Sequence, residues 1–313
     1  MSSFRLTLED SSVVTGKTYF ELDRKYEFSS KTIPLLVCVP GGAYDSDYFD
    51  FEPKHSLRSL SKMLGIPVVC VDRPGYGEST DVSNIGNTFI QRHGRWLNNL
   101  VLPSIWKEFS ASLNASSIVL YGESIGGAVS TVAAGMYASD PPAYPLSGLV
   151  LSAMSTKPQT QQLTSYFSDE SLRGKPIHMP FEQRISHAAG DNPELFDPVV
   201  FTSRKGMSST SVEELYDINI QWPTYYAKYA EKITVQVQYS MGEYDQLWHI
   251  NRDTMNEFTQ SLKNSFWVEA RFQKNAPHCI EFSYQCTAFY LRVFGFAMEC
   301  SDSYAIDEER KRT

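Results

Sequence analysis

The sequence contains no uninterrupted apolar run that approaches the ~18 residues of a membrane-spanning helix. Residues 1–5 also lack the apolar segment of a secretory signal peptide. The five cysteines are an odd number, and they are scattered along the chain without the spacing of a disulfide framework. These absences predict a cytoplasmic protein that keeps its thiols reduced and has no membrane span.

The sequence also lacks clusters of basic residues, metal-binding motifs and a phosphate-binding loop. The chain has 28 Lys and Arg against 36 Asp and Glu, a formal net charge of −8, which argues against nucleic acid as a partner. No group of His, Cys or carboxylate residues has the spacing of a metal site. Gly75 and Gly77 are not followed by the Lys-Ser/Thr of a phosphate-binding loop. We therefore expect no metal, no cofactor, and a small molecule as the substrate.

Apolar runs of strand length alternate with segments of helical spacing along most of the 313 residues. Residues 33–39 and 66–71 are continuous apolar runs, typical of strands that are covered on both faces. Helical spacing occurs at 54–64 and at 86–110, where Pro103 should kink or divide the helix. Strands and helices in this order predict an α/β fold with a mostly parallel central sheet and helices on both faces.

The alternation breaks between residues 153 and 230, where helical spacing occurs only in pieces. The segment is too long for a simple connection in a compact domain, and it is rich in aromatic residues, Met and Pro. We predict that residues 1–152 and 231–313 form the core and that 153–230 form an inserted helical cap. Some of its large side chains would close an apolar pocket, although most of them must build the small core of the cap itself.

The segment 118–129 joins a strand, a tight turn and a helix. Its β-branched run leads into Gly-Glu-Ser-Ile-Gly at 122–126, and an alanine-rich segment with helical spacing follows. This is the order of a nucleophile elbow, in which a serine occupies a strained turn and flanking glycines remove the steric clash. The hydroxyl of Ser124 would then stand at a helix N-terminus, where backbone N–H groups stabilise a developing oxyanion.

A serine becomes a nucleophile when a histidine accepts its proton and a carboxylate orients that histidine. Asp245 follows the strand predicted at 233–239, and His278 lies between a later strand and the last helix. Ser124, Asp245 and His278 are therefore the predicted catalytic residues. Glu243 is the alternative acid, because it lies two residues from Asp245.

Several neighbouring side chains have other interpretations. Cys279 lies beside the predicted catalytic histidine but has no elbow, so we interpret it as a small packing residue. Glu123 could tune the site, but we expect it to cap a backbone group or to face away. Asp72 is interpreted as part of a turn. One of His178 and His187 is a candidate for contact with the substrate.

In these motifs the chain resembles the α/β-hydrolase superfamily, and the resemblance covers nearly its whole length. It rests on Pro-Gly-Gly at 40–42, on residues 72–79, on the elbow, and on the order of the Asp and His loops. The resemblance implies an oxyanion hole formed by the backbone N–H of Ile125 and by a second N–H from the loop after the first apolar strand. We choose Gly42 as the second donor and leave Ala43 open, because the family often has His where this chain has a proline.

The first candidates for the substrate pocket are residues close to the nucleophile or to the loop after the first apolar strand. Two tryptophans are added as further candidates. The candidates are Gly41, Ala43, Tyr44, Trp222 and Trp248.

The predicted function is that of a serine hydrolase that cleaves an ester or thioester of an apolar acyl group through an acyl-enzyme. The large aromatic cap is similar to that of biosynthetic-type esterases and thioesterases, in which water or the substrate's own hydroxyl resolves the acyl-enzyme. Acyl transfer or macrolactonisation, cleavage of a carbon–carbon or amide bond, and a receptor-like ligand-binding protein are the alternatives.

Overall fold

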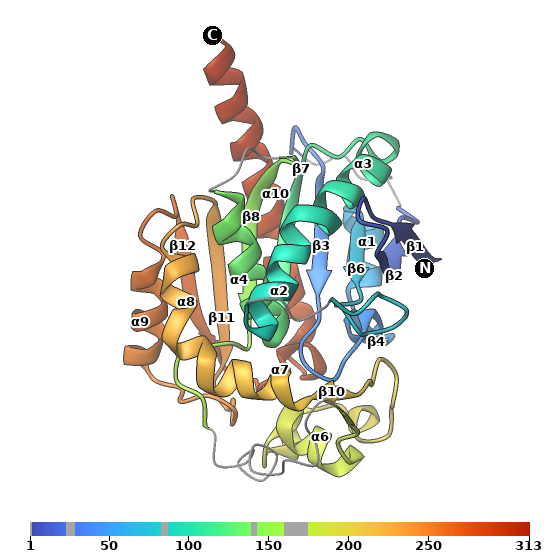
Figure 1. Cartoon of the computed structure of the whole chain (residues 1–313), viewed down its shortest axis with the longest axis vertical. Helices are drawn as coiled ribbons and strands as arrows, with labels where there is room; N and C mark the ends of the chain where they lie inside the picture. The colour runs from blue at the N-terminus through green and yellow to red at the C-terminus, as the bar shows by residue number, and fades with distance from the viewer. Residues whose placement is uncertain (1, 23–28, 83–86, 139–142, 160–174) are drawn as a thin grey trace.

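The computed structural model describes residues 2–22, 29–82, 87–138, 143–159 and 175–313, and an eight-stranded sheet forms the centre of this described part (Figure 1). The strand order is β1-β2-β6-β3-β7-β8-β11-β12. β2 runs antiparallel to both of its neighbours, and the other pairs along the sheet are parallel. The predicted α/β fold with a mostly parallel sheet is confirmed. The strands are β1 (Ser2–Thr7), β2 (Val13–Tyr19), β3 (Pro34–Val39), β6 (Val68–Val71), β7 (Ser117–Glu123), β8 (Leu146–Ser152), β11 (Gln236–Gly242) and β12 (Val268–Gln273).

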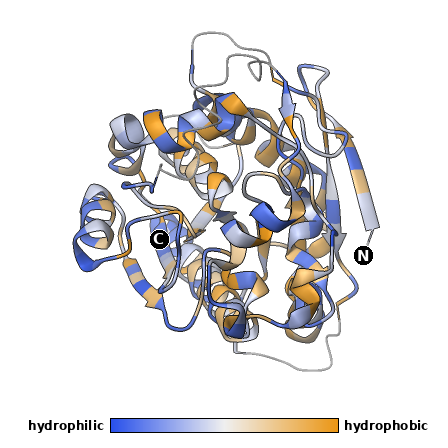
Figure 2. Ribbon diagram, turned by 90° about the horizontal axis from the view of Figure 1, so that it is seen from below, coloured by the Kyte–Doolittle hydropathy of each residue, from blue (hydrophilic) through white to orange (hydrophobic). Residues whose placement is uncertain are grey.

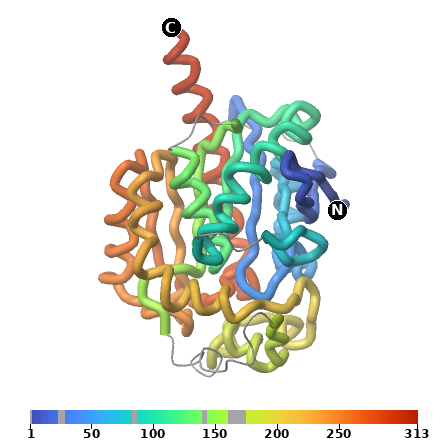
Figure 3. The backbone as a smooth tube through the Cα atoms, in the orientation of Figure 1, coloured from blue at the N-terminus to red at the C-terminus, as the bar shows by residue number. Residues whose placement is uncertain are grey.

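Helices cover both faces of the sheet (Figure 1). One face carries α2 (Phe89–Trp96), α3 (Leu102–Leu113), α4 (Ile125–Tyr137) and α8 (Trp222–Ala230), and α9 (Arg252–Ser261) packs beside α8 and β12. The other face carries α1 (Leu57–Leu64) and α10 (Cys286–Arg312). Figure 2 shows hydrophobic and hydrophilic positions alternating along the outer helices, as expected of helices that cover a sheet on one side and meet solvent on the other. The C-terminal end of α10 projects beyond the rest of the molecule (Figure 3).

The strands β3 and β6 are apolar and buried along their whole length, on both faces of the sheet. In β3, Leu35 and Val37 belong to the hydrophobic core under α2 and α4, whereas Leu36 and Cys38 belong to the core under α1 and α10. Successive side chains of a strand point to opposite faces, so a continuous apolar run supplies both cores. Full burial of one Val or Leu side chain stabilises the fold by about 1.5–3 kcal/mol.

The long helix predicted around Pro103 is interrupted but not ended by the proline. α2 continues through a π-helical turn, Leu97–Val101, into α3, and the N–H of Leu102 donates to the carbonyl of Leu97. Proline has no N–H, and its ring collides with the carbonyl four residues earlier in a regular helix. The wider π turn directly before Pro103 accommodates this conflict.

Residues 175–216 lie across the end of the sheet where β3 and β7 finish (Figure 1). They contain α6 (Phe181–Ala189), α7 (Val212–Tyr216) and the antiparallel pair β9 (Pro176–Ile177) and β10 (Thr210–Ser211). A second small pair, β4 (Asp50–Glu52) with β5 (His55–Ser56), follows β3.

The C-terminal part of the predicted cap, residues 153–230, contains α8. α8 packs on α4, and its Trp222 belongs to the main hydrophobic core rather than to a separate one. Residues 160–174 lie outside the described residues. The two domain boundaries stay a prediction, and below "the insert" means residues 175–216.

A bilayer crossing needs about 20 consecutive apolar residues, and no helix in the described parts of the chain offers such a stretch.

Candidate active site

The turn between β7 and α4 has the geometry of a nucleophile elbow. Ser124 stands between the two elements with φ 50° and ψ −119°, a conformation that L-residues rarely adopt. A Cβ atom at Gly126 would lie 2.2 Å from the carbonyl oxygen of Val39, and one at Gly122 would lie 2.4 Å from that of Gly126. Both contacts are with backbone, which cannot easily move, so this turn requires glycine on each side of the serine.

Ser124, His278 and Asp245 form one hydrogen-bonded series. The Nε2 atom of His278 lies 3.0 Å from the Ser124 Oγ, and its Nδ1 atom lies 2.8 Å from Oδ2 of Asp245. All three residues are buried, with 9%, 5% and 4% of the surface of Ser124, His278 and Asp245 exposed. The structure therefore brings together the three residues that the sequence predicts, which lie up to 154 positions apart.

The acid of this series is Asp245 and not the alternative, Glu243. The second oxygen of Asp245 accepts a hydrogen bond from the N–H of Leu247 at 2.8 Å, which fixes the carboxylate toward the histidine. Glu243 is exposed and accepts a hydrogen bond from the N–H of Asn275 instead.

The surroundings of His278 make its imidazole basic. Desolvation is the largest influence and lowers the pKa of His278, but the charge and hydrogen bond of Asp245 oppose it. With the further charges of Glu123 and Glu281, they raise the pKa of His278 to about 9. With this pKa the ring is largely protonated near pH 7, and it is the neutral form, which gains population as the pH rises, that can accept the proton of the serine.

The loop at residues 40–43, called the oxyanion loop below, is held by side chains from beneath. Arg73 donates from Nε to the carbonyl of Pro40 at 2.9 Å and from a terminal nitrogen to the carbonyl of Gly41 at 2.8 Å. The N–H of Gly41 donates to Oε2 of Glu123 at 2.9 Å. Gly41 is therefore a structural residue of the loop.

The choice between Gly42 and Ala43 as oxyanion donor is decided by which N–H group is free. Ala43 donates to the hydroxyl oxygen of Tyr76 at 3.2 Å. Within the described parts of the chain, the N–H groups of Gly42 and of Ile125, the first residue of α4, have no recorded acceptor. This arrangement favours Gly42 and Ile125 as the pair that meets an oxyanion.

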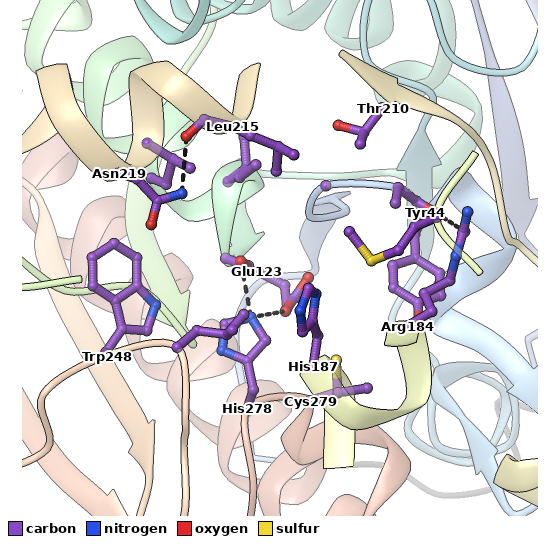
Figure 4. A pocket seen from close by; sticks show the side chains of 18 of the residues that line it. Tyr44, Glu123, Arg184, His187, Thr210, Leu215, Asn219, Trp248, His278 and Cys279 are labelled. Atoms are coloured by element: carbon purple, nitrogen blue, oxygen red, sulfur yellow. Dashed lines mark hydrogen bonds and ion pairs between the residues drawn. The ribbon is translucent and has the colours of Figure 1, made fainter. Parts of the chain in front are cut away.

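Glu123 does cap a backbone group, since it accepts the N–H of Gly41, but it does not face away from the site. Its Oε1 atom is buried without a hydrogen-bond partner among the described residues and lies 3.8 Å from Nε2 of His278. Desolvation and then the charge of Glu281 raise the pKa of Glu123, His278 opposes both, and the resulting pKa is about 8. Figure 4 shows the Glu123 side chain directed toward His278.

Sequence reasoning missed Glu281, a second buried carboxyl group close to His278. Ser152 donates to its Oε1 at 3.0 Å and Tyr48 donates to its Oε2 at 2.8 Å, while Tyr121 also donates to Oε1. Burial raises the pKa of Glu281. No sequence motif marks this residue, because its partners come from β7, β8 and the segment after β3.

A pocket opens above the serine and encloses about 780 Å³, counting its open mouth. Of the predicted pocket residues, Ala43, Tyr44 and Trp248 line it, together with Gly42, Ile125, Ser124 and His278. Most of the surface that lines the pocket is apolar, as expected of a small-molecule site. The remaining apolar lining residues are Met179, Ala188, Leu215, Ile218 and Leu247, and Glu123, Gln159, Arg184, His187, Thr210, Asn219 and Cys279 also line it.

Two predicted pocket residues do not line this pocket. Gly41 lies beneath the loop, where a Cβ atom would come within 2.3 Å of the Glu123 carboxylate. Trp222 is fully buried in the main core, and its indole N–H donates to the carbonyl of Ser155 at 2.9 Å. The indole is large and has one polar atom, so it fits where an apolar core offers a single acceptor.

The polar lining residues include His187, one of the two histidines considered for substrate contact. Burial, with a contribution from His278, lowers the pKa of His187 to about 4, so its ring is neutral near pH 7. His178 is exposed and does not line the pocket.

Cys279 lines the pocket, but burial raises the pKa of its thiol well above the ordinary range. Across the described residues, no three His, Cys, Asp or Glu side chains converge as a metal site requires.

The sheet order, the strained serine turn and the Ser–His–Asp series at the ends of the strands define a protein of the α/β-hydrolase class. A model of the alpha/beta hydrolase family matches residues 36–270, and the chain belongs to this family. No curated protein matches the sequence.

Solved structures share the fold at low sequence identity. A malate-bound thermophilic esterase from Thermogutta terrifontis has a TM-score of 0.64 and 14% identity, with 96% of this chain and 100% of the esterase covered. A putative lipase from Acinetobacter baumannii AYE has a TM-score of 0.60 and 16% identity, with 96% of this chain and 92% of the lipase covered. A thioesterase domain from the curacin biosynthetic pathway has a TM-score of 0.57 and 13% identity, with 94% of this chain and 99% of the thioesterase domain covered. At these identities the likeness shows the fold alone.

Proposed function

We propose that the protein is a serine hydrolase that cleaves an ester or thioester of an apolar acyl group through an acyl-enzyme. The observation that carries this proposal is the series from the Ser124 Oγ through His278 to Asp245, at 3.0 and 2.8 Å, at the base of a mostly apolar pocket. A structural or binding role gives no reason for such a series beside a strained serine.

In the proposed reaction, Nε2 of His278 takes the proton of Ser124 as Oγ attacks the carbonyl carbon of the substrate. The N–H groups of Gly42 and Ile125 then donate to the oxyanion of the tetrahedral intermediate. Loss of one such donor typically lowers kcat by about 10²- to 10³-fold. When the intermediate collapses, the imidazolium returns the proton to the leaving oxygen or sulfur, and the acyl group stays on Ser124.

Water or a hydroxyl of the substrate itself can resolve the acyl-enzyme. Hydrolysis is the simpler outcome. The burial of Ser124, with 9% of its surface exposed, favours the second candidate, acyl transfer or lactonisation, because a site that excludes water protects the acyl-enzyme from hydrolysis. We also place the protein in the cytoplasm, since all five cysteines are free and buried.

The test is intact-mass spectrometry after reaction with a fluorophosphonate probe, combined with turnover of short-chain to long-chain acyl esters and thioesters. The native protein should take one adduct on Ser124, and Ser124→Ala and His278→Ala should take none. Ser130→Ala is the matched control, because Ser130 is also buried but lies away from the pocket. A folded native protein that takes no adduct would refute the proposal and leave a receptor-like ligand-binding protein as the better reading.

The same samples separate the remaining alternatives. Turnover of amides or of carbon–carbon bonds at rates above those of the esters would move the proposal to another reaction of the same serine. A hydroxy-acyl thioester that yields a lactone rather than a free acid would establish the cyclising outcome.

A further inference from the structure

We propose that Arg184 and Glu214, two residues of the insert, are positioning residues for the oxyanion hole. Together with Tyr76 they hold the oxyanion loop, residues 40–43, in the conformation that leaves the N–H of Gly42 free. This inference rests on the proposed function, because it concerns the oxyanion hole of that reaction.

Glu214, from α7, reaches the oxyanion loop through two side chains of the core. One carboxylate oxygen forms an ion pair with Arg73 at 2.6 Å, and the other accepts a hydrogen bond from the Tyr76 hydroxyl at 2.6 Å. Arg73 in turn donates to the carbonyls of Pro40 and Gly41. Only 1% of each side chain of the ion pair is exposed, so removal of either partner would leave an uncompensated buried charge.

The contacts of Ala43 show why the loop needs this support. Ala43 has a φ of 63°, a left-handed conformation that costs roughly 1–2 kcal/mol in a residue with a Cβ atom. Tyr76 accepts from its N–H, and its carbonyl accepts from Arg184 at 2.6 Å and from the N–H of Ser208 at 2.9 Å. Both polar groups of this strained residue are therefore bound, directly or through Tyr76, to the insert.

Backbone hydrogen bonds join the insert, and the segment after β8, to three segments next to site residues. The N–H of Asp45 donates to the carbonyl of Gly206 at 2.9 Å, next to the Ala43–Ser208 bond. Residues 157–159 pair with 247–249, after Asp245, and the N–H of Cys279 donates to the carbonyl of Ala188. The insert thus holds these segments in place through hydrogen bonds, and moving it away from the core would break the contacts that shape the oxyanion loop.

The decisive variant is Tyr76→Phe. It removes the hydroxyl that joins Glu214 to the N–H of Ala43, but it keeps the ring that packs against the Arg73 guanidinium at 4.3 Å and leaves no charge unpaired. Glu214→Gln is less suitable, because it leaves the buried Arg73 without its counter-charge and can prevent folding.

We expect Tyr76→Phe to lower kcat for an acyl ester by about 10- to 100-fold, because displacements of about 1 Å at a reacting group have effects of that size. KM should change little, since the apolar lining of the pocket stays in place. The inhibition constant of a trifluoromethyl ketone, which adds to Ser124 as a tetrahedral oxyanion, should rise by the same factor as kcat/KM falls. Tyr290→Phe is the matched control, because the hydroxyl of Tyr290 is buried without a partner in the described structure.

Arg184→Met tests the other side of the loop. It should also lower kcat and weaken the trifluoromethyl ketone, and its effect should be less than additive with that of Tyr76→Phe, because both variants release the same residue, Ala43. Arg184→Lys should restore part of the loss, since its ammonium can still donate to the Ala43 carbonyl.

The two proposals fail in distinguishable ways. If the native protein takes no fluorophosphonate adduct, the proposed function fails and this inference with it. If the native protein turns over esters, but Tyr76→Phe and Arg184→Met lower only the melting temperature and leave kcat and the ketone inhibition constant unchanged, the positioning roles are refuted and the proposed function stands.

Discussion

Replacing Glu123 by Gln should make the stability of the folded protein less dependent on pH. The Glu123 carboxyl is 1% exposed, and desolvation, followed by the charge of Glu281, raises its pKa from an ordinary 4.5 to about 8. Between these two pH values the folded protein holds a proton that the unfolded chain has released. The free energy of unfolding therefore falls as the pH rises through this window.

The size of the effect follows from the two pKa values. Each pH unit inside the window changes the free energy of unfolding by about 1.4 kcal/mol per proton. Between pH 6 and pH 8 the contribution of Glu123 amounts to about 2 kcal/mol, allowing for its partial titration near pH 8. His278 acts in the same direction: its pKa is also raised, so the stability that it contributes is fully present below about pH 6.5 and is lost as the pH rises through about 9. The contribution of His278 to the pH dependence should remain in Glu123→Gln, because Asp245 is the main group that raises the pKa of His278.

The amide of Glu123→Gln keeps the shape of the side chain, and its oxygen can still accept the Gly41 N–H. The assay is urea unfolding at pH 6, 7 and 8 for the native protein, for Glu123→Gln, and for Ser124→Ala, which leaves the carboxyl in place. Between pH 6 and pH 8 the free energy of unfolding of Glu123→Gln should fall by about 2 kcal/mol less than that of the native protein. The free energy of unfolding of Ser124→Ala should fall as much as that of the native protein. Equal losses in all three proteins would refute a protonated Glu123 at neutral pH.

Three further substitutions test the elbow and the pocket. Gly126→Ala places a Cβ atom 2.2 Å from the backbone oxygen of Val39, so we expect a lower melting temperature and no probe adduct; an active, equally stable variant would contradict the elbow packing. Trp248→Ala should shift the preference in kcat/KM toward longer or bulkier acyl groups, because Trp248 is a wall of the pocket; an unchanged acyl-chain profile would show that the acyl group binds elsewhere. Cys279→Ala should keep the adduct on Ser124 and turnover within about tenfold, whereas loss of the adduct would mean that the thiol takes part in the reaction.

Local sequence patterns were sufficient to predict the fold and the three residues of the hydrogen-bonded series. The apolar runs at β3 and β6 are buried on both faces, as their composition predicts. The elbow was recognisable because its strand, its turn and its helix are consecutive in the chain, and the glycines beside Ser124 are required by contacts within a few residues or with the adjacent strand. Asp245 and His278 were recognisable because parallel strands bring the loops at their carboxyl ends to one edge of the sheet.

The residues that the sequence did not reveal act through long-range contacts between different elements. Glu281 is surrounded by hydroxyl groups from three separate segments, and Arg184 reaches Ala43 across 141 positions. Trp222 was assigned to the pocket because it lies in an aromatic-rich segment, but the packing of α8 on α4 places it in the main core.

The sequence by itself determined the order of the elements and the identity of Ser124, Asp245 and His278, because period-2 burial and turn chemistry are local properties of the chain. Only the tertiary structure decided that Gly42 rather than Ala43 has the free N–H, and that Glu123 faces His278. These outcomes depend on which polar groups meet in the buried space between distant elements. A hydrogen bond there is settled by packing in three dimensions, which no pattern of neighbouring residues records.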